Sequence, residues 1–153
     1  MKRSISAVAV CVGMMGFNLA FAEEMKMQMG NHHHDMSVMD TRTSLGLSGP
    51  MKQHQLSNMR EHIDAIKSIA GLMSEQKFEE ASKVAHAKLG LTPDMQSMCN
   101  MFENEDFRRL GFAFHKSGDD LGEALKTRDM SASLRALNRT MQYCVECHAT
   151  YRQ

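Results

Sequence analysis

The chain ends in a stretch around which the rest of the sequence can be organised: Cys144-Val145-Glu146-Cys147-His148-Ala149-Thr150-Tyr151-Arg152. Its two cysteines are separated by two residues, and a histidine follows the second cysteine directly. On a helix, residues at positions i, i+3 and i+4 share one face. If this stretch is helical, Cys144, Cys147 and His148 can therefore all reach one common group.

The C-x-x-C-H pattern is typical of the covalent attachment of a c-type haem. The two thiols add to vinyl groups of the porphyrin, and the adjacent imidazole binds the iron as an axial ligand. A redox disulfide is the first alternative, but the surrounding sequence lacks the strands of a thioredoxin-type site. A zinc site is the second, but Cys99 is the only other cysteine expected to survive processing. We therefore expect one covalent haem c held by Cys144, Cys147 and His148.

Read as C-x-x-C-H-x-x-Y-R at the extreme C-terminus, the same stretch resembles the cytochromes c′, the class II c-type cytochromes. Most other c-type cytochromes carry the motif near the start of the domain, so its position supports the resemblance. The similarity covers roughly residues 52–153 and is specific in the last ten of them. Family membership would imply an all-α four-helix bundle that encloses the haem.

The first 22 residues have the features of a secretory signal peptide. Lys2 and Arg3 precede an apolar stretch from Ile5 to Leu19, and Ala20-Phe21-Ala22 forms a small-x-small cleavage site. The apolar stretch is short for a membrane span. We expect residues 1–22 to be removed on export, which leaves a periplasmic protein without a stable membrane anchor.

The charge of the exported chain argues against a nucleic-acid or membrane-surface partner. Without Lys2 and Arg3, 16 basic residues stand against 18 acidic ones, a formal charge of −2. The remaining 131 residues suit one domain, and no internal repeat is evident. We expect periplasmic redox proteins as partners. A homodimer is a candidate assembly, because Cys99 would be an unpaired thiol in an oxidising compartment.

Residues 23–50 differ in kind from the rest, and no helix or strand period fits them. They contain Met25, Met27, Met29, His32, His33, His34, Met36 and Met39. One interpretation is a flexible polar leader between the signal peptide and the domain. The other is a copper site at residues 25–39, because thioethers suit Cu(I) and imidazoles suit copper generally.

From residue 51 to 153, apolar residues recur at helical spacing in four segments. The first stripe is Leu56, Met59, Ile63, Ile66, Ala70 and Met73; the second is Phe78, Ala81, Val84, Ala85 and Leu89. The third is Phe107, Leu110, Gly111, Phe114, Gly118, Leu121 and Leu125; the fourth is Leu134, Leu137, Met141, Cys144, His148 and Tyr151. Four such helices with short connections predict an antiparallel up-down-up-down four-helix bundle.

Local signals predict where these helices begin and end. Gly90 is expected to end the second helix as its C′ residue, and Thr92 can cap a short turn within a loop over residues 90–104. Gly118 is expected to be a weak point in the third helix, and Ser131 is expected to cap the fourth. Because the motif lies on the fourth apolar stripe, the haem is expected inside the bundle.

The resemblance also implies what lies on the far side of the iron. In the cytochromes c′ the first helix places an apolar residue there, and in a smaller group of relatives a methionine from that helix binds the iron. The matching position falls near Met59. Three alternatives remain open: Met59 is core with His62 solvated, Met59 is the sixth ligand, or His62 turns inward and binds.

Three further residues correspond to positions in the family. Tyr151 resembles the tyrosine that packs near the haem edge. Arg152, four residues after His148, resembles the basic residue on the proximal face. Arg60 resembles the arginine that meets a haem propionate.

These features together predict an exported mono-haem one-electron carrier rather than an enzyme. The first alternative is a five-coordinate haem that binds nitric oxide or carbon monoxide. The second is a periplasmic copper-handling protein that uses residues 25–39.

Overall fold

The computed structural model describes residues 40–153. The predicted signal peptide (1–22), Cys11 and the candidate copper segment (25–39) lie outside these residues. The described elements are β1 (Thr43–Ser44), α1 (Gly49–Ser74), α2 (Phe78–Val84), the π-helix η1 (Ala85–Leu89), α3 (Pro93–Asn100), α4 (Glu105–Lys126), α5 (Met130–Thr150) and β2 (Tyr151–Arg152). The fold is therefore mostly helical, as the sequence predicts.

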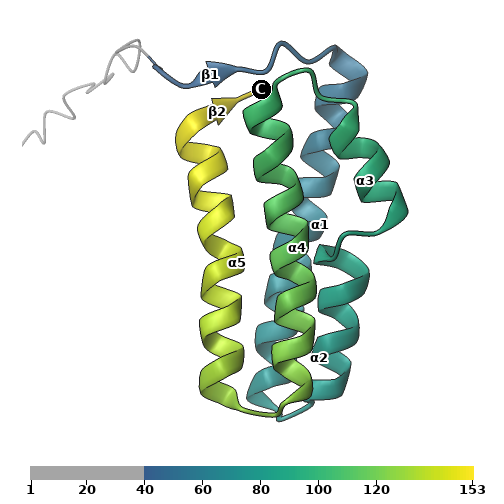
Figure 1. Cartoon of the computed structure of the whole chain (residues 1–153), viewed down its shortest axis with the longest axis vertical. Helices are drawn as coiled ribbons and strands as arrows, with labels where there is room; N and C mark the ends of the chain where they lie inside the picture. The colour runs from purple at the N-terminus through teal and green to yellow at the C-terminus, as the bar shows by residue number, and fades with distance from the viewer. Residues whose placement is uncertain (1–39) are drawn as a thin grey trace, which may run out of the picture. The chain divides into compact units, whose positions relative to one another are not determined.

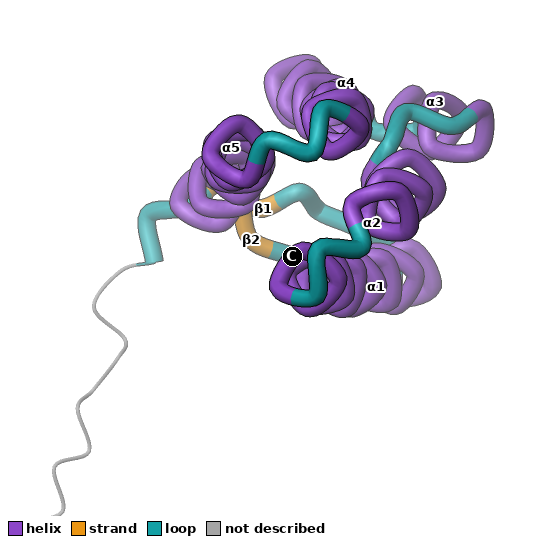
Figure 2. The backbone as a smooth tube through the Cα atoms, turned by 90° about the horizontal axis from the view of Figure 1, so that it is seen from below, coloured by secondary structure: helices purple, strands orange, loops and turns teal. Residues whose placement is uncertain are grey.

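The body of the molecule is formed by α1, by α2 continued in η1, by α4 and by α5, which lie side by side (Figures 1 and 2). α1 packs on α2 and η1, these two pack on α4, and α4 packs along α5. Within residues 40–153 no comparably extensive contact joins α1 to α5. The bundle is thus well packed on three sides and open along the fourth.

The main core lies where α1, α2, η1 and α4 meet. Its buried side chains are Ala65, Ile69, Met73, Phe78, Ala81, Ala85, Leu89, Phe114, Leu121, Leu125 and Leu137. A second cluster at the motif end of α5 consists of Phe102, Phe107 and Tyr151, whose rings pack edge-to-face. The stripe predicted for the third helix is confirmed in α4, which buries Phe107, Phe114, Gly118, Leu121 and Leu125.

The stripe predicted for the first helix is confirmed at Met73 but is wrong at Ile63. The buried residues of α1 are Gln55, His62, Ala65, Ile69 and Met73, whereas Ile63 is 63% exposed. In α5, Leu134 and Met141 are likewise exposed although both were expected in the core. The physical reason is the sparse contact between α1 and α5, since apolar residues that face this side have no helix against them.

Three local expectations also need correction. Asp129, not Ser131, caps α5, with its Oδ1 accepting from the Ala132 amide at 3.0 Å. Gly90 ends η1 in extended backbone (φ −70°) and not in the left-handed conformation of a C′ glycine. The segment 90–104 contains the helix α3, capped by Thr92 as expected.

Residues 40–47, here named the N-terminal strap, lie against the end of α5. β1 pairs in parallel with β2, Thr43 opposite Tyr151, and the Leu45 amide donates to the Arg152 carbonyl at 3.0 Å. Leu45 and Leu47 pack on the second apolar cluster. The packed domain therefore begins by residue 40, earlier than the boundary at residue 51 that the sequence suggested.

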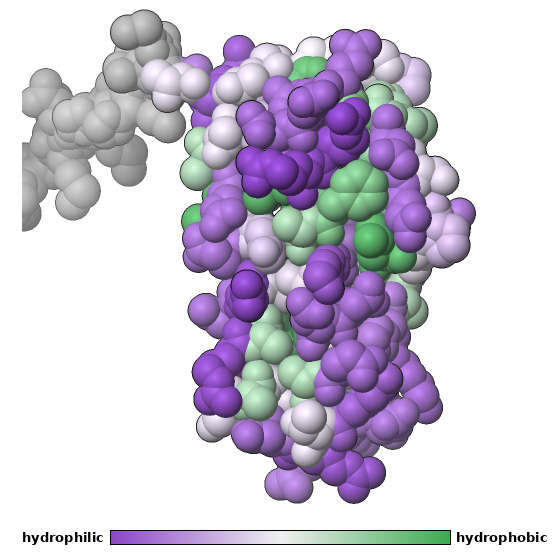
Figure 3. Space-filling model, viewed as in Figure 1, coloured by the Kyte–Doolittle hydropathy of each residue, from purple (hydrophilic) through white to green (hydrophobic). Residues whose placement is uncertain are grey.

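The surface is largely polar, with apolar patches between the charged residues (Figure 3). Among residues 40–153 the exposed large apolar side chains are Ile63, Met101, Met130, Leu134, Met141 and Val145. No helix in this part of the chain is both long and apolar enough to cross a membrane.

Candidate functional site

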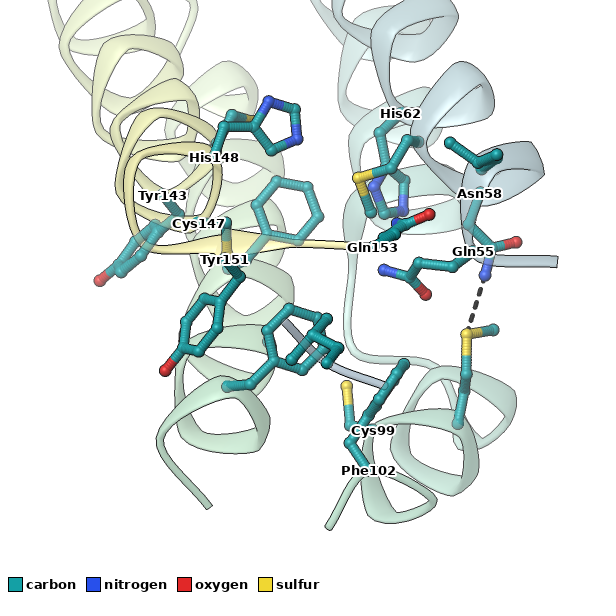
Figure 4. Close-up of a pocket in the computed structure, with 18 of the residues that line it drawn as sticks. Gln55, Asn58, His62, Cys99, Phe102, Tyr143, Cys147, His148, Tyr151 and Gln153 are labelled. Carbon is teal, nitrogen blue, oxygen red and sulfur yellow. Dashed lines mark hydrogen bonds between the residues drawn. The ribbon is translucent and has the colours of Figure 1, made fainter. Parts of the chain in front are cut away.

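A cavity of about 470 Å³ lies between α1, α3, α4, α5 and the N-terminal strap. Its size is within the range of small-molecule and cofactor sites. α1 contributes Leu56, Met59, His62 and Ile63; α4 contributes Phe107, Gly111, Phe114 and His115; α5 contributes Tyr143, Cys144, Cys147 and His148. The structure thus brings the C-terminal motif and the first helix to one largely apolar space (Figure 4).

The motif residues lie on the last two turns of α5, which stays helical through Thr150. Cys144, Cys147 and His148 accordingly line the same cavity. Both cysteines are free thiols, and within residues 40–153 no group of three or more His, Cys, Asp or Glu side chains is placed to hold a metal ion. The described residues therefore do not assemble the zinc site considered as an alternative.

The environment of the two thiols keeps them protonated at neutral pH. Burial raises the pKa of Cys144. Burial, with the nearby Cys144 and Glu146, raises the pKa of Cys147 to about 11. Cys144 and Cys147 would hold a haem through thioether bonds; the net addition of S–H across a vinyl group would place sulfur on one carbon and hydrogen on the other, so no oxidant or reductant would be required.

The opposite wall of the cavity is formed by α1, where His62 points inward. Its side chain is 7% exposed, and its ring packs 4.8 Å from Phe114 and 5.4 Å from His115, between ring centroids. Burial, and secondarily the neighbouring His115, lowers the pKa of His62 to about 4, so the imidazole is uncharged at neutral pH. Of the three alternatives, the one in which Met59 is core and His62 is solvated is therefore wrong for His62. Met59, the predicted sixth ligand, is half-buried and also lines the cavity.

His115 is a buried residue of this wall that sequence reasoning missed. It is 5% exposed, and its Nδ1–H donates to the Leu89 carbonyl oxygen at 2.9 Å. The sequence did contain a signal for the burial of His115. Three glycines, Gly111, Gly118 and Gly122, lie at helical spacing on the same side of α4. Small residues allow another backbone to approach closely, and a polar residue among them becomes buried.

Basic and amide side chains are also among the residues that line the cavity. Arg42, Lys52, Arg108 and Arg152 line it, together with Gln55 and Gln153. The Lys52 Nζ donates to the Gln153 carbonyl at 3.3 Å, while the Gln153 Oε1 is buried without a partner. Such groups suit the carboxylates of a bound molecule.

The remaining predicted site residues fall in two groups. Tyr151 is buried against Phe107, with ring centroids 5.1 Å apart, and it lines the cavity beside Arg152. The Arg152 Nε lies 3.8 Å from Asp40 in the strap. Arg60 is exposed on α1 and does not line the cavity. The structure thus supplies Arg42, Lys52 and Arg108 near the cavity where the resemblance suggested Arg60.

This set of groups fits a haem c. Two thiols and an imidazole stand on one wall, an uncharged imidazole and a thioether on the other, and cations suited to propionates lie among the lining residues. The residues present therefore account for both the apolar and the carboxylate parts of the cofactor.

Comparison with known proteins agrees with this geometry. A family model described as cytochrome C′ matches residues 22–152, a longer span than the resemblance found from residue 52 onward. No curated protein and no solved structure matches the chain. With the match covering most of the sequence and the motif residues meeting in one cavity, the chain belongs to the cytochrome c′ family of haem-binding c-type cytochromes.

Proposed function

We propose that this protein is an exported one-electron carrier with a single haem c attached through Cys144 and Cys147 in an antiparallel up-down-up-down bundle. His148 is the axial ligand from α5, and α1 supplies the second one. The bound cofactor would supply one-electron exchange at its iron. The observation that carries the proposal is that His148 and the donor side chains of α1 line the same cavity from opposite walls (Figure 4).

The α1 wall favours electron transfer over gas binding. It presents two side chains that bind iron, the Met59 thioether and the His62 imidazole. An iron held by protein ligands on both sides must lose one of them before carbon monoxide or nitric oxide can bind. An entirely apolar wall would instead leave that position free for gas, which is the alternative function.

The open side of the bundle suits exchange of electrons with another protein. Ile63, which lines the cavity, is 63% exposed, so the cavity reaches the surface between α1 and α5. We propose periplasmic redox proteins as partners and no catalysed reaction beyond electron transfer. A homodimer and a copper-handling role for residues 25–39 are separate hypotheses, and the latter concerns residues outside the described part of the chain.

The attachment is tested by denaturing the mature protein. The wild type should stay coloured on a denaturing gel and should run heavier by one haem. Cys144→Ala should lose most of the covalent haem, because one thioether is a weaker tether. Cys99→Ala is the matched control, since Cys99 is also a buried cysteine that lines the cavity but lies outside the motif. Complete extraction of the colour by acid acetone would contradict a c-type haem.

Redox titration separates the two functions. A carrier should show a reversible one-electron couple and should bind carbon monoxide only slowly in the reduced state. Immediate carbon monoxide binding by the reduced wild type would instead make gas binding the better assignment.

A further inference from the structure

We propose that His62, and not Met59, is the second axial ligand, so that the iron is held between His62 and His148. This inference rests on the proposed haem c. It differs from the ligand that the family resemblance implies, which is Met59. The assignment of Met59 rests only on its position in the sequence of α1. The argument uses instead the burial, hydrogen bonding and surroundings of the His62 ring.

His62 is more than nine-tenths buried and has no hydrogen-bond partner within residues 40–153. The other two histidines at η1 and α4 each make one hydrogen bond. His115 donates to the Leu89 carbonyl at 2.9 Å, and His86 Nδ1 lies 3.0 Å from Asp119 Oδ1, whereas His86 Nε2, 3.1 Å from Glu123, is buried without a hydrogen bond. Leaving a buried polar group unpaired is unfavourable. A metal bond to a ring nitrogen would satisfy this one.

Both His62 and Met59 line the cavity, but His62 is the more deeply buried of the two. His62 belongs to the buried stripe of α1 with Gln55, Ala65 and Ile69, whereas Met59 is only half-buried. Successive helix residues are about 100° apart, so Met59 lies about 60° from His62, toward exposed Ile63. Figure 4 shows the His62 and His148 side chains extending toward each other from α1 and α5.

The ring of His62 is also held in place by its neighbours. It packs against Phe114 at 4.8 Å and against His115 at 5.4 Å, both from α4. His115 is itself fixed by its hydrogen bond to Leu89. A ligand locked by such packing loses little rotamer freedom when it binds, whereas a methionine side chain must order three rotatable bonds.

Ligation by two imidazoles has a recognisable signature. Thioether ligation raises the reduction potential of a haem, so two nitrogen ligands give a lower potential than a histidine–methionine pair. Both pairs give a low-spin iron, but only the thioether produces a sulfur-to-iron charge-transfer band in the ferric spectrum. The ligand can therefore be identified in the wild-type protein without a mutation.

The test compares ferric wild type, His62→Ala and Met59→Ala as full mature chains carrying covalent haem. Electron paramagnetic resonance and absorption spectra should show a low-spin wild type without the sulfur band. His62→Ala should lose the low-spin signal completely and should recover it on addition of free imidazole. Met59→Ala, which removes the competing donor, should stay low-spin.

Three outcomes would overturn the assignment. They are a sulfur band in the wild type, a low-spin His62→Ala without added imidazole, and a wild type that is already high-spin. If the haem is covalent and exchanges electrons reversibly, these outcomes overturn the ligand assignment alone. Haem that is extracted by acid acetone would overturn the proposed function as well.

Discussion

Two imidazoles, His62 and His115, are buried side by side in the wall of the cavity with ring centroids 5.4 Å apart. Burial is the main cause of the lowered pKa of each. A histidine that stays uncharged in the folded protein binds fewer protons than it does in the unfolded chain. This difference lowers the free energy of unfolding as the pH falls below the unfolded pKa of about 6.5. Above that pH the histidine has no such effect.

His115→Gln should therefore flatten the dependence of the free energy of unfolding on pH below about 6.5. The amide of glutamine can still donate to the Leu89 carbonyl, so stability at pH 8 should change little. Urea unfolding at a series of pH values measures this dependence. His54→Gln, at an exposed position of α1, is the matched control and should keep the wild-type slope. An unchanged slope in His115→Gln would contradict the inferred burial of an uncharged ring.

Sequence alone could predict the motif residues because they are contiguous and share one helix face. Cys144, Cys147 and His148 follow from spacing with no knowledge of tertiary contacts. The role of His62 could not be predicted in this way. Its inward position depends on which side of α1 meets α4, and a polar residue on a buried stripe is assigned to solvent by hydropathy.

Helix contacts in this protein depend on glycines of α4 that face η1. A Cβ on Gly118 would lie 2.5 Å from the Leu89 carbonyl carbon, closer than any side chain tolerates. The sequence suggested Gly118 as a weak point of its helix, but α4 runs through it and uses the missing side chain for close approach. This contact also brings the Leu89 carbonyl within 2.9 Å of His115 Nδ1.

Gly118→Ala should destabilise the protein by roughly 1–3 kcal/mol, because the obstacle is backbone and cannot rotate away. Gly71→Ala provides the matched control, since a Cβ there meets nothing within 4 Å on an exposed position of α1. It should stabilise by roughly 0.5–1 kcal/mol, the usual gain of alanine over glycine in a helix. Thermal and urea unfolding compare the two variants. Equal changes in the free energy of unfolding would show that η1 leaves room for a side chain at position 118 of α4.

The periodicity of α4 predicted its core face correctly, whereas that of α1 and α5 did so only in part, at Met73 and Leu137. α4 is surrounded by α2, η1 and α5, so each of its apolar residues meets a partner. Ile63 on α1, and Leu134 and Met141 on α5, are exposed instead. Apolar spacing identifies the existence of a helix, but a helix beside a cofactor cavity has two apolar sides, and spacing does not tell them apart.

At the scale of the whole molecule, the N-terminal strap is part of the cavity wall. Arg42 and Leu45 line the cavity, and the Arg42 Nη1 donates to the His148 carbonyl at 3.2 Å. The sequence treated residues up to 50 as a flexible leader because no regular period is present there. Two-residue strands are too short to produce one.

Two truncations separate the leader from the strap. Removal of residues 23–38 should leave the haem spectrum and the melting temperature unchanged. Removal of residues 23–47 should cost roughly 2 kcal/mol from the loss of two partly buried leucines, and should open the cavity to faster carbon monoxide binding. Stopped-flow mixing and thermal melting measure both effects. If both truncations behave alike, the strap does not contribute to the site.

The pairing of β1 with β2 also has a consequence for the order of folding. It joins residues 43–44 to residues 151–152, and closing a flexible loop on the order of 100 residues costs about 4 kcal/mol of chain entropy. Two short strands cannot supply this alone, so they should pair only after the helices have brought the ends together. The part of the cavity wall that Arg42 and Leu45 form would then be the last to close.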